Sequence, residues 1–292
     1  MNETQTTAQP PPDSGSQPLL ALKGFTKSFG PVEALKDVEL NVVPGEVVAL
    51  VGDNGAGKST LIKAISGAQP PDSGSATWEG RPVRLQSPHD ATSIGIATVY
   101  QDLALADNLD VVGNLFLGHE IVNYGVLDEI TMERRATELL STLSVRIPSV
   151  RIPVAALSGG QRQSVAITRS LLGEPKVVML DEPTAALGVV QTAQVLDLIE
   201  RLRDRGLGVI LISHNLADVK AVADRVMVLR LGRNAGQFDM ARASQEEIVQ
   251  AITGASDLAA ARHKPRGEGR EATTIPSAGD TGGHPARTEA EQ

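Results

Sequence analysis

The sequence predicts an α/β fold in which helices cover both faces of a parallel β-sheet. The first observation is a set of short runs that are apolar at every position, which is typical of strands buried on both faces. The second is that segments with helical spacing of apolar residues lie between these runs. The third is a loosely alternating stretch near the N-terminus, which is typical of a half-exposed antiparallel sheet. The apolar runs are Val47–Val51, Ile96–Val99, Val177–Leu180, Val209–Ile212 and Val226–Leu229.

Composition limits the function classes. The chain has 292 residues, 41% of them hydrophobic but only 2% aromatic, so we expect one large domain, or a domain with a subdomain, and an aliphatic core. The formal net charge of −8 argues against broad binding to nucleic acid, and no nucleic-acid partner is predicted. The absence of cysteine excludes disulfides and thiolate metal sites. Neither a secretory signal nor a membrane-spanning helix is predicted, so any membrane role would come through a partner.

The folded region is expected to span residues 19–254, between tails at 1–18 and 255–292. Both tails are polar and lack periodicity, so we expect them to be disordered. Residues 19–43 alternate loosely and residues 75–85 return to short strands, which predicts a small antiparallel β subdomain. Residues 103–172 predict a mainly helical insertion, in which MERRATELLSTL at 132–143 places leucines at helical spacing. Residues 191–203 predict a further helix by the same pattern.

The stretch GDNGAGKST at 52–60 follows the first apolar run and precedes a helical pattern. It matches G-x-x-x-x-G-K-[ST], a loop whose glycines turn tightly and point main-chain N–H groups at phosphates. Lys58 would reach the β- and γ-phosphates, and the Ser59 hydroxyl would ligate Mg²⁺. A Gly-rich turn that carries Lys-Ser by coincidence is the alternative, but the strand–loop–helix context favours a P-loop NTPase (RecA-like) core. The predicted nucleotide contacts are Gly52, Asn54, Gly55, Ala56, Gly57, Lys58, Ser59 and Thr60.

A second motif, LSGGQ at 157–161, precedes another helical pattern. Ser158 and Gln161 have the capping-box spacing, so a helix should begin here. Gly159 and Gly160 would expose main-chain N–H groups and make a second anion-binding helix N-terminus. An ordinary capped helix is an equally good reading from spacing alone, although capping does not explain two adjacent glycines, which cost about 1 kcal/mol each inside a helix.

Polar residues follow three of the apolar runs. Asp181 and Glu182 end the run at 177–180, where neighbouring side chains point to opposite sides. Asp181 therefore suits organisation of Mg²⁺ near Ser59, and Glu182 suits a base for the attacking water. Gln101 and His214 each follow a run at the same edge of the sheet, where ligands bind in such folds. Solvated acids, or loop residues making local hydrogen bonds, are the alternatives.

Taken together, GDNGAGKST, Gln101, LSGGQ, VVMLDE and His214 occur in an order that resembles the ATP-binding subunit of an ABC transporter, over about residues 19–254. The resemblance implies ATP and Mg²⁺ as ligands. It also implies that the LSGGQ loop of one subunit closes on the ATP held by another, in a homodimer or with a paired ATPase domain. Gln101 is implied to contact Mg²⁺ and relay movement to the membrane subunits, His214 to hold the γ-phosphate, and Phe29 to stack on adenine. The helical insertion is implied to dock against the permease.

A finer likeness to monosaccharide importers of the ribose, xylose and fructose type rests on VGDNGAGKSTLIKAISG, VYQDLALADNLDVVGNLFLG and DEPTAALG. It implies an ATP-hydrolysing subunit on the cytoplasmic face of the membrane, with a multi-spanning permease and, indirectly, an extracellular or periplasmic sugar-binding protein. Many such importers carry two ATPase domains in one chain, whereas this sequence has one phosphate loop, which indicates a homodimer. Gly188 stands where the family often has Asp, which puts the cross-subunit contact of that Asp in doubt.

Two rival functions remain from the sequence. A soluble ABC-type ATPase acting on translation or DNA would need two such domains or a long coiled-coil insert, and the chain is acidic. A small-molecule kinase with a phosphate loop would leave LSGGQ as an ordinary helix cap. Co-purification with a multi-spanning membrane protein would distinguish a transport function from both rival functions.

Overall fold

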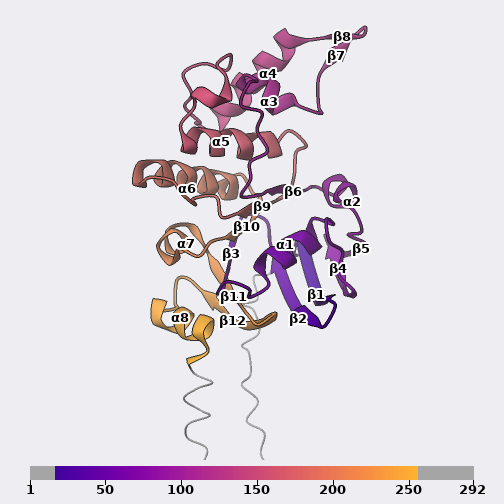
Figure 1. Ribbon diagram of the computed structural model, residues 1–292, viewed down its shortest axis with the longest axis vertical. Coiled ribbons are helices and arrows are strands. Elements are labelled where there is room, and N and C mark those ends of the chain that lie inside the picture. The colour runs from indigo at the N-terminus through magenta and orange to yellow at the C-terminus, as the bar shows by residue number, and fades with distance from the viewer. Residues whose placement is uncertain (1–16, 256–292) are drawn as a thin grey trace, which may run out of the picture. The chain divides into compact units, whose positions relative to one another are not determined.

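The computed structural model describes residues 17–255 (Figure 1). The tails predicted at 1–18 and 255–292 fall almost entirely outside the described residues. The described part contains a six-stranded sheet, a four-stranded antiparallel sheet and a helical insertion, as the sequence predicted. Within it, no helix is both long enough and apolar enough to cross a membrane.

The central sheet has the order β12-β11-β3-β10-β9-β6. All five apolar runs form its parallel strands, so this prediction is confirmed. The sixth strand, β12, is antiparallel to β11 and was not predicted, because it is polar and only half-buried. The strands of the central sheet are β3 (Val47–Val51), β6 (Ile96–Val99), β9 (Val177–Asp181), β10 (Gly208–Ile212), β11 (Arg225–Arg230) and β12 (Arg233–Asp239).

Each face of this sheet supports its own hydrophobic cluster, because successive side chains of a strand point to opposite faces. On β3, Val48 and Leu50 join a cluster with helix α1 (Lys58–Ile65) and the antiparallel sheet. Val47, Ala49 and Val51 join the opposite cluster. That cluster is completed by residues of α5 (Gly159–Ser170), α6 (Val189–Asp204), α7 (Leu216–Val222) and α8 (Gln245–Thr253). Burial of each Val or Leu contributes about 1.5–3 kcal/mol, which holds the strand ends in place.

The antiparallel sheet has the order β2-β1-β4-β5. Its strands are β1 (Leu20–Phe29), β2 (Val32–Val42), β4 (Ser73–Trp78) and β5 (Arg81–Val83). The short helix α2 (Pro88–Ser93) follows, with Ser87 accepting a hydrogen bond from Asp90 N as its N-cap. The sheet packs over α1 on one face of the central sheet, so it lies close to the phosphate loop.

The insertion contains α3 (Val111–Phe116), α4 (Glu129–Thr142), a short 3₁₀ turn (Val154–Ala156) and α5, around a third hydrophobic cluster. Buried Asn114 stabilises it internally by bonding the main chain of Ala106, Leu109 and Asp110. A β-hairpin, β7 (Val122–Asn123) and β8 (Val126–Leu127), departs from the helical prediction. Tyr124 and Gly125 form its two-residue turn with positive φ angles of 53° and 82°, the backbone that tight hairpins require. Figure 1 shows the hairpin extending beyond α3 and α4, at the end of the described structure opposite to α8.

Candidate functional site

The phosphate loop joins β3 to α1 and presents a helix N-terminus without a side-chain cap. Its N-cap residue, Gly57, has a φ of 108° and supplies no side chain to bond the first N–H groups of the helix. Those N–H groups and the positive end of the helix dipole therefore remain available to an anion. Gly52 cannot be replaced easily, because a Cβ there would lie 2.2 Å from the Leu229 carbonyl oxygen.

Lys58, the first residue of α1, turns back over the loop. Its side chain is almost completely buried, and its ammonium donates to the main-chain oxygens of Gly52 at 2.7 Å and Asp53 at 3.1 Å. These bonds hold a single compact cation inside the curve of the loop. A phosphate at the helix N-terminus would meet this ammonium as well as the main-chain N–H groups.

A cavity of about 290 Å³ opens beside this loop. It gathers seven of the eight predicted loop residues with Gln101, Asp181 and Glu182, whereas Gly52 does not line it. The lining suits a phosphate chain with a divalent cation. Ser59, Gln101 and Asp181 offer the oxygen ligands that Mg²⁺ prefers. The lining residues are Ala34, Asn54, Gly55, Ala56, Gly57, Lys58, Ser59, Thr60, Gln101, Asp181, Glu182 and Ile212.

Asp181 ends β9 and Glu182 follows it, and both line the cavity, so the different roles predicted for them stay a prediction. Asp181 is half-buried at the end of β9, and burial raises the pKa of its carboxyl, with a further increase from the neighbouring Glu182 carboxylate. The charges of Lys58 and Lys63 act in the opposite direction. Glu182 leaves the strand with a positive φ of 50°, and its main-chain N–H donates to Ile212 O at 3.0 Å.

His214 lies beside Glu182 and not in the wall of the cavity. Its Nδ1 is 2.7 Å from Glu182 Oε2, and its side chain is 69% exposed. The two residues come from the ends of neighbouring parallel strands, β9 and β10. This direct contact can orient the Glu182 carboxylate, and the contact of His214 with the γ-phosphate stays a prediction.

A buried aspartate that sequence reasoning missed ties these two loops together. Asp218 is 6% exposed and accepts hydrogen bonds from Thr184 Oγ1 at 2.6 Å and from Asn215 Nδ2 at 2.9 Å. Thr184 follows Glu182 by two residues, and Asn215 follows His214 directly. Asn215 caps helix α7, so an Asn–x–x–Asp spacing was present in the sequence as a signal. Asp218 therefore fixes the position of Glu182 relative to His214.

Replacing Asp218 with Ala is expected to lower ATP turnover by about ten- to a hundredfold while nucleotide affinity is unchanged. Charge-assisted hydrogen bonds are worth about 1.5–3 kcal/mol, and their loss here would act on the Glu182–His214 geometry. Steady-state kinetics measures the effect, with melting temperature as a check on folding. Asp218→Asn, which keeps one acceptor, should lose less, and the exposed Asp204→Ala should lose nothing. Wild-type turnover by Asp218→Ala would contradict this role.

The LSGGQ segment forms the predicted helix start. Ser158 is the N-cap of α5, with Gln161 N donating to Ser158 Oγ at 3.3 Å and Ser158 N donating to Gln161 Oε1 at 3.0 Å. The capping box is therefore confirmed. A Cβ on Gly160 would lie 2.9 Å from Gln191 Cβ of α6, so close packing of two helices is a sufficient reason for this glycine. None of Ser158, Gly159, Gly160 and Gln161 lines the phosphate-loop cavity.

Phe29 also lies outside that cavity. It ends β1 and is 45% exposed as a residue, and Lys27 Nζ is 5.8 Å from the ring centroid. Ala34, from the next strand, lines the cavity instead and was not singled out in the sequence. Adenine stacking on Phe29 stays a prediction.

Comparisons with known proteins agree with this geometry. The family described as "ABC transporter" matches residues 35–185. A xylose/arabinose import ATP-binding protein of Sulfolobus acidocaldarius is 46% identical over 80% of this chain and 94% of the relative. A fructose import ATP-binding protein of Rhizobium meliloti is 45% identical over 82% of this chain and 96% of the relative.

A solved structure supports the same assignment at the level of the fold. It is a dimeric, post-hydrolysis ATP-binding cassette bound to ADP and phosphate, with a TM-score of 0.64 and 26% identity. The match covers 76% of this chain and 98% of that chain. Sequence, fold and site thus agree, and the chain belongs to the ABC transporter family as an ATP-binding cassette.

Proposed function

We propose that this chain is the ATP-hydrolysing subunit of a monosaccharide importer, acting at the cytoplasmic face of the membrane. The observation that carries the proposal is the single cavity that joins the phosphate loop to Gln101, Asp181 and Glu182. The import ATP-binding relatives, named for xylose, arabinose and fructose, support the substrate class. A multi-spanning permease and an extracellular or periplasmic sugar-binding protein complete the proposed importer.

The described residues divide the chemistry among them. Lys58 and the main-chain N–H groups of the loop hold the β- and γ-phosphates, and Ser59, Gln101 and Asp181 are the residues that would hold Mg²⁺. When bound, that ion would neutralise the charge on the phosphate oxygens. Glu182 accepts the proton of the attacking water, and His214 orients the Glu182 carboxylate through the 2.7 Å contact.

The signature residues Ser158–Gln161 belong to a different surface from the phosphate loop, as their absence from its cavity indicates. We propose that a second copy of the chain supplies them to the ATP, and the dimeric cassette in the comparison supports this. Closure would then depend on ATP, because its contacts with the partner's signature segment exist only in the closed dimer.

Specific ATPase activity is expected to fall when the purified chain is diluted below its dimer dissociation constant. Turnover per chain should rise with concentration and then level off, since only dimers contain complete sites. Sizing chromatography with multi-angle light scattering, with ATP bound to a chain carrying Glu182→Gln, would report the dimer directly. A constant specific rate from a monomer at every concentration would overturn the shared site.

The exposed apolar residues on and beside the β7–β8 hairpin, which we call the hairpin surface, offer a docking site for the permease. Six exposed apolar residues gather within residues 117–130, including Tyr124, whose relative exposure is 107%. The segment 117–133 contains four carboxylates and no Lys or Arg, although Arg151 pairs with two of them, Glu129 and Glu133. Cytoplasmic loops of membrane proteins carry an excess of Lys and Arg, whereas the inner lipid surface is anionic and would repel these acids. The hairpin surface consists of Leu117, Val122, Tyr124, Val126, Leu127 and Ile130.

Replacing Tyr124 and Ile130 together with Ser is expected to abolish stimulation of ATP hydrolysis by the permease. Both side chains lie on the hairpin surface, so basal ATPase activity and melting temperature should not change. The measurement uses the permease that co-purifies with this chain, reconstituted in lipid vesicles. Val249→Ser, which changes an exposed apolar residue on α8, is the matched control. Undiminished stimulation of the double variant would exclude this surface.

A further inference from the structure

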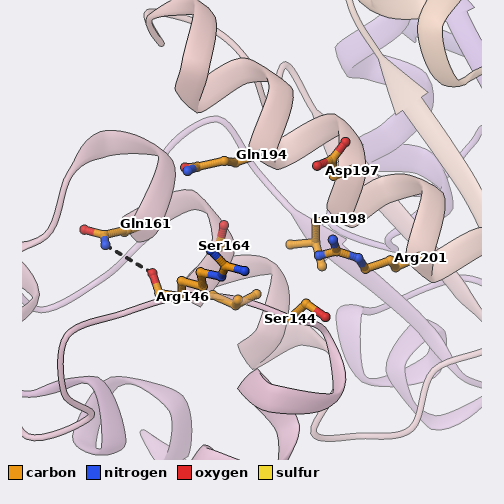
Figure 2. Close-up of a pocket in the computed structure, with 9 residues that line it drawn as sticks. Ser144, Arg146, Gln161, Ser164, Gln194, Asp197, Leu198 and Arg201 are labelled. Atoms are coloured by element: carbon orange, nitrogen blue, oxygen red, sulfur yellow. Dashed lines mark hydrogen bonds between the residues drawn. The ribbon is translucent and has the colours of Figure 1, made fainter.

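A second polar cavity lies behind the signature segment, between α5, α6 and the loop at 144–146 (Figure 2). Its volume is about 310 Å³, within the size range of small-molecule sites, and it shares no lining residue with the phosphate-loop cavity. The proposed ATPase chemistry uses none of its side chains except Gln161. We call it the α5–α6 cavity.

Two arginines give this cavity a positive wall. Arg146 comes from the loop and Arg201 from α6, and Figure 2 shows both side chains reaching toward the space between the two helices. Arg201 Nη1 donates to Leu143 O at 2.8 Å, which anchors its side chain and leaves further N–H donors. The guanidinium of Arg146 makes no hydrogen bond or ion pair with any residue in the described range 17–255. A guanidinium group matches the geometry of a phosphate, because it offers two parallel N–H donors.

The rest of the polar lining comes from the same helix and loop as the two arginines. Gln194 and Asp197 of α6 and Ser144 of the loop also line the cavity. Neither the Gln194 amide nor the Asp197 carboxylate has a hydrogen-bond partner among the described residues. A carboxylate repels a bare anion but accepts hydrogen bonds from hydroxyl groups. An amide both donates and accepts hydrogen bonds. The lining thus combines guanidinium donors, which suit a phosphate, with a carboxylate and an amide, which suit hydroxyl groups.

We infer that the α5–α6 cavity binds a small phosphate ester with a polyhydroxyl body, of which a phosphorylated monosaccharide is the matching class. Arg146 and Arg201 would hold the phosphate, and Asp197 and Gln194 the hydroxyl groups. This ligand class rests on the proposed function, since an imported monosaccharide is the compound whose phosphorylated form would report internal supply.

The cavity is joined to the signature segment through one side chain. Gln161 lines the cavity, donates from Nε2 to Arg146 O at 3.1 Å, and accepts at Oε1 from Ser158 N at 3.0 Å. A ligand on Arg146 therefore lies next to the loop that anchors the cap of α5. Binding would bias whichever arrangement of this cap it fits better, and so couple to the nucleotide cycle.

The test is calorimetric titration of the full chain with ribose 5-phosphate, after its phosphate loop has been saturated with Mg²⁺ and a non-hydrolysable ATP analogue. This pre-saturation removes competition at Lys58. Arg146→Ala should weaken binding about tenfold or more, because it removes a charge-assisted contact. Arg205→Ala, an exposed arginine at the end of α6 outside the cavity, should bind as wild type does.

Asp197→Ala distinguishes binding of the ester from binding of a bare anion, because it should change the two affinities in opposite directions. Loss of this carboxylate should weaken ribose 5-phosphate binding but strengthen that of inorganic phosphate. Inorganic phosphate or ribose binding the wild-type chain as tightly as the ester would overturn the inference, as would an unaffected Arg146→Ala. ATP hydrolysis is scored separately, so an active chain that ignores the ester refutes this inference alone. An inactive chain that binds the ester refutes the proposed function instead.

Discussion

Glu182→Gln is expected to lower ATP turnover by about 10²- to 10⁴-fold, the contribution of a positioned general base. The amide has the size of the carboxylate but cannot accept a proton from water. It can still bond Nδ1 of His214, which in the wild-type chain is 2.7 Å from Glu182 Oε2. The loop geometry should therefore survive, and ATP should bind with unchanged affinity while hydrolysis stalls.

The measurement pairs a turnover assay with equilibrium nucleotide binding. Because the closed dimer would no longer be opened by hydrolysis, a stable ATP-bound dimer should appear on sizing columns. Glu246→Gln, on the exposed side of α8, is the control and should keep full activity. A Glu182→Gln chain that turns over ATP at the wild-type rate would exclude Glu182 as the base.

Lys58→Ala should remove most of the nucleotide affinity. The buried ammonium of Lys58 holds the Gly52 and Asp53 carbonyls and is the main positive charge in the loop cavity. A hydrogen bond to a charged group contributes about 1.5–3 kcal/mol, and two phosphates are involved, so we expect a loss of at least a hundredfold.

Fluorescent-nucleotide titration measures this loss directly. Lys63→Ala, one turn further along α1 and exposed, is the matched control and should retain affinity within a few-fold. If Lys58→Ala bound ATP as the wild type does, main-chain N–H groups alone would account for the site, and the role of the lysine would be wrong.

Much of the fold was readable because its signals are local. The five apolar runs became parallel strands, since only full burial tolerates an apolar side chain at every position. The Ser158–Gln161 spacing identified the start of α5 because a capping box involves only residues within one helical turn. The tight hairpin at Tyr124–Gly125 has a local signal too, the glycine at its turn, but the leucine spacing within residues 103–172 predicts mainly helix.

Other features had no local signal. Gly160 is required by the approach of Gln191 from α6, 31 positions away in the sequence, so its neighbours in the sequence could not account for it. The spacing of Asn215 and Asp218 is local, but the hydrogen bond from Thr184 to Asp218 spans 34 positions and could not be inferred from that spacing. The exposed position of Phe29, outside the loop cavity, likewise depends on how β1 packs and not on the motif around it.

By itself the sequence determined the five buried strands, the start of α5, the phosphate-binding loop and the polar residues that end the strands, because main-chain torsions and side-chain alternation are set by near neighbours. Only the tertiary structure decided which strand ends meet. The sheet order places β3, β10, β9 and β6 side by side, although they follow one another in the chain as β3, β6, β9 and β10. Packing of the two sheet faces selects that order, and it brings Lys58, Gln101, Asp181 and Glu182 into one cavity.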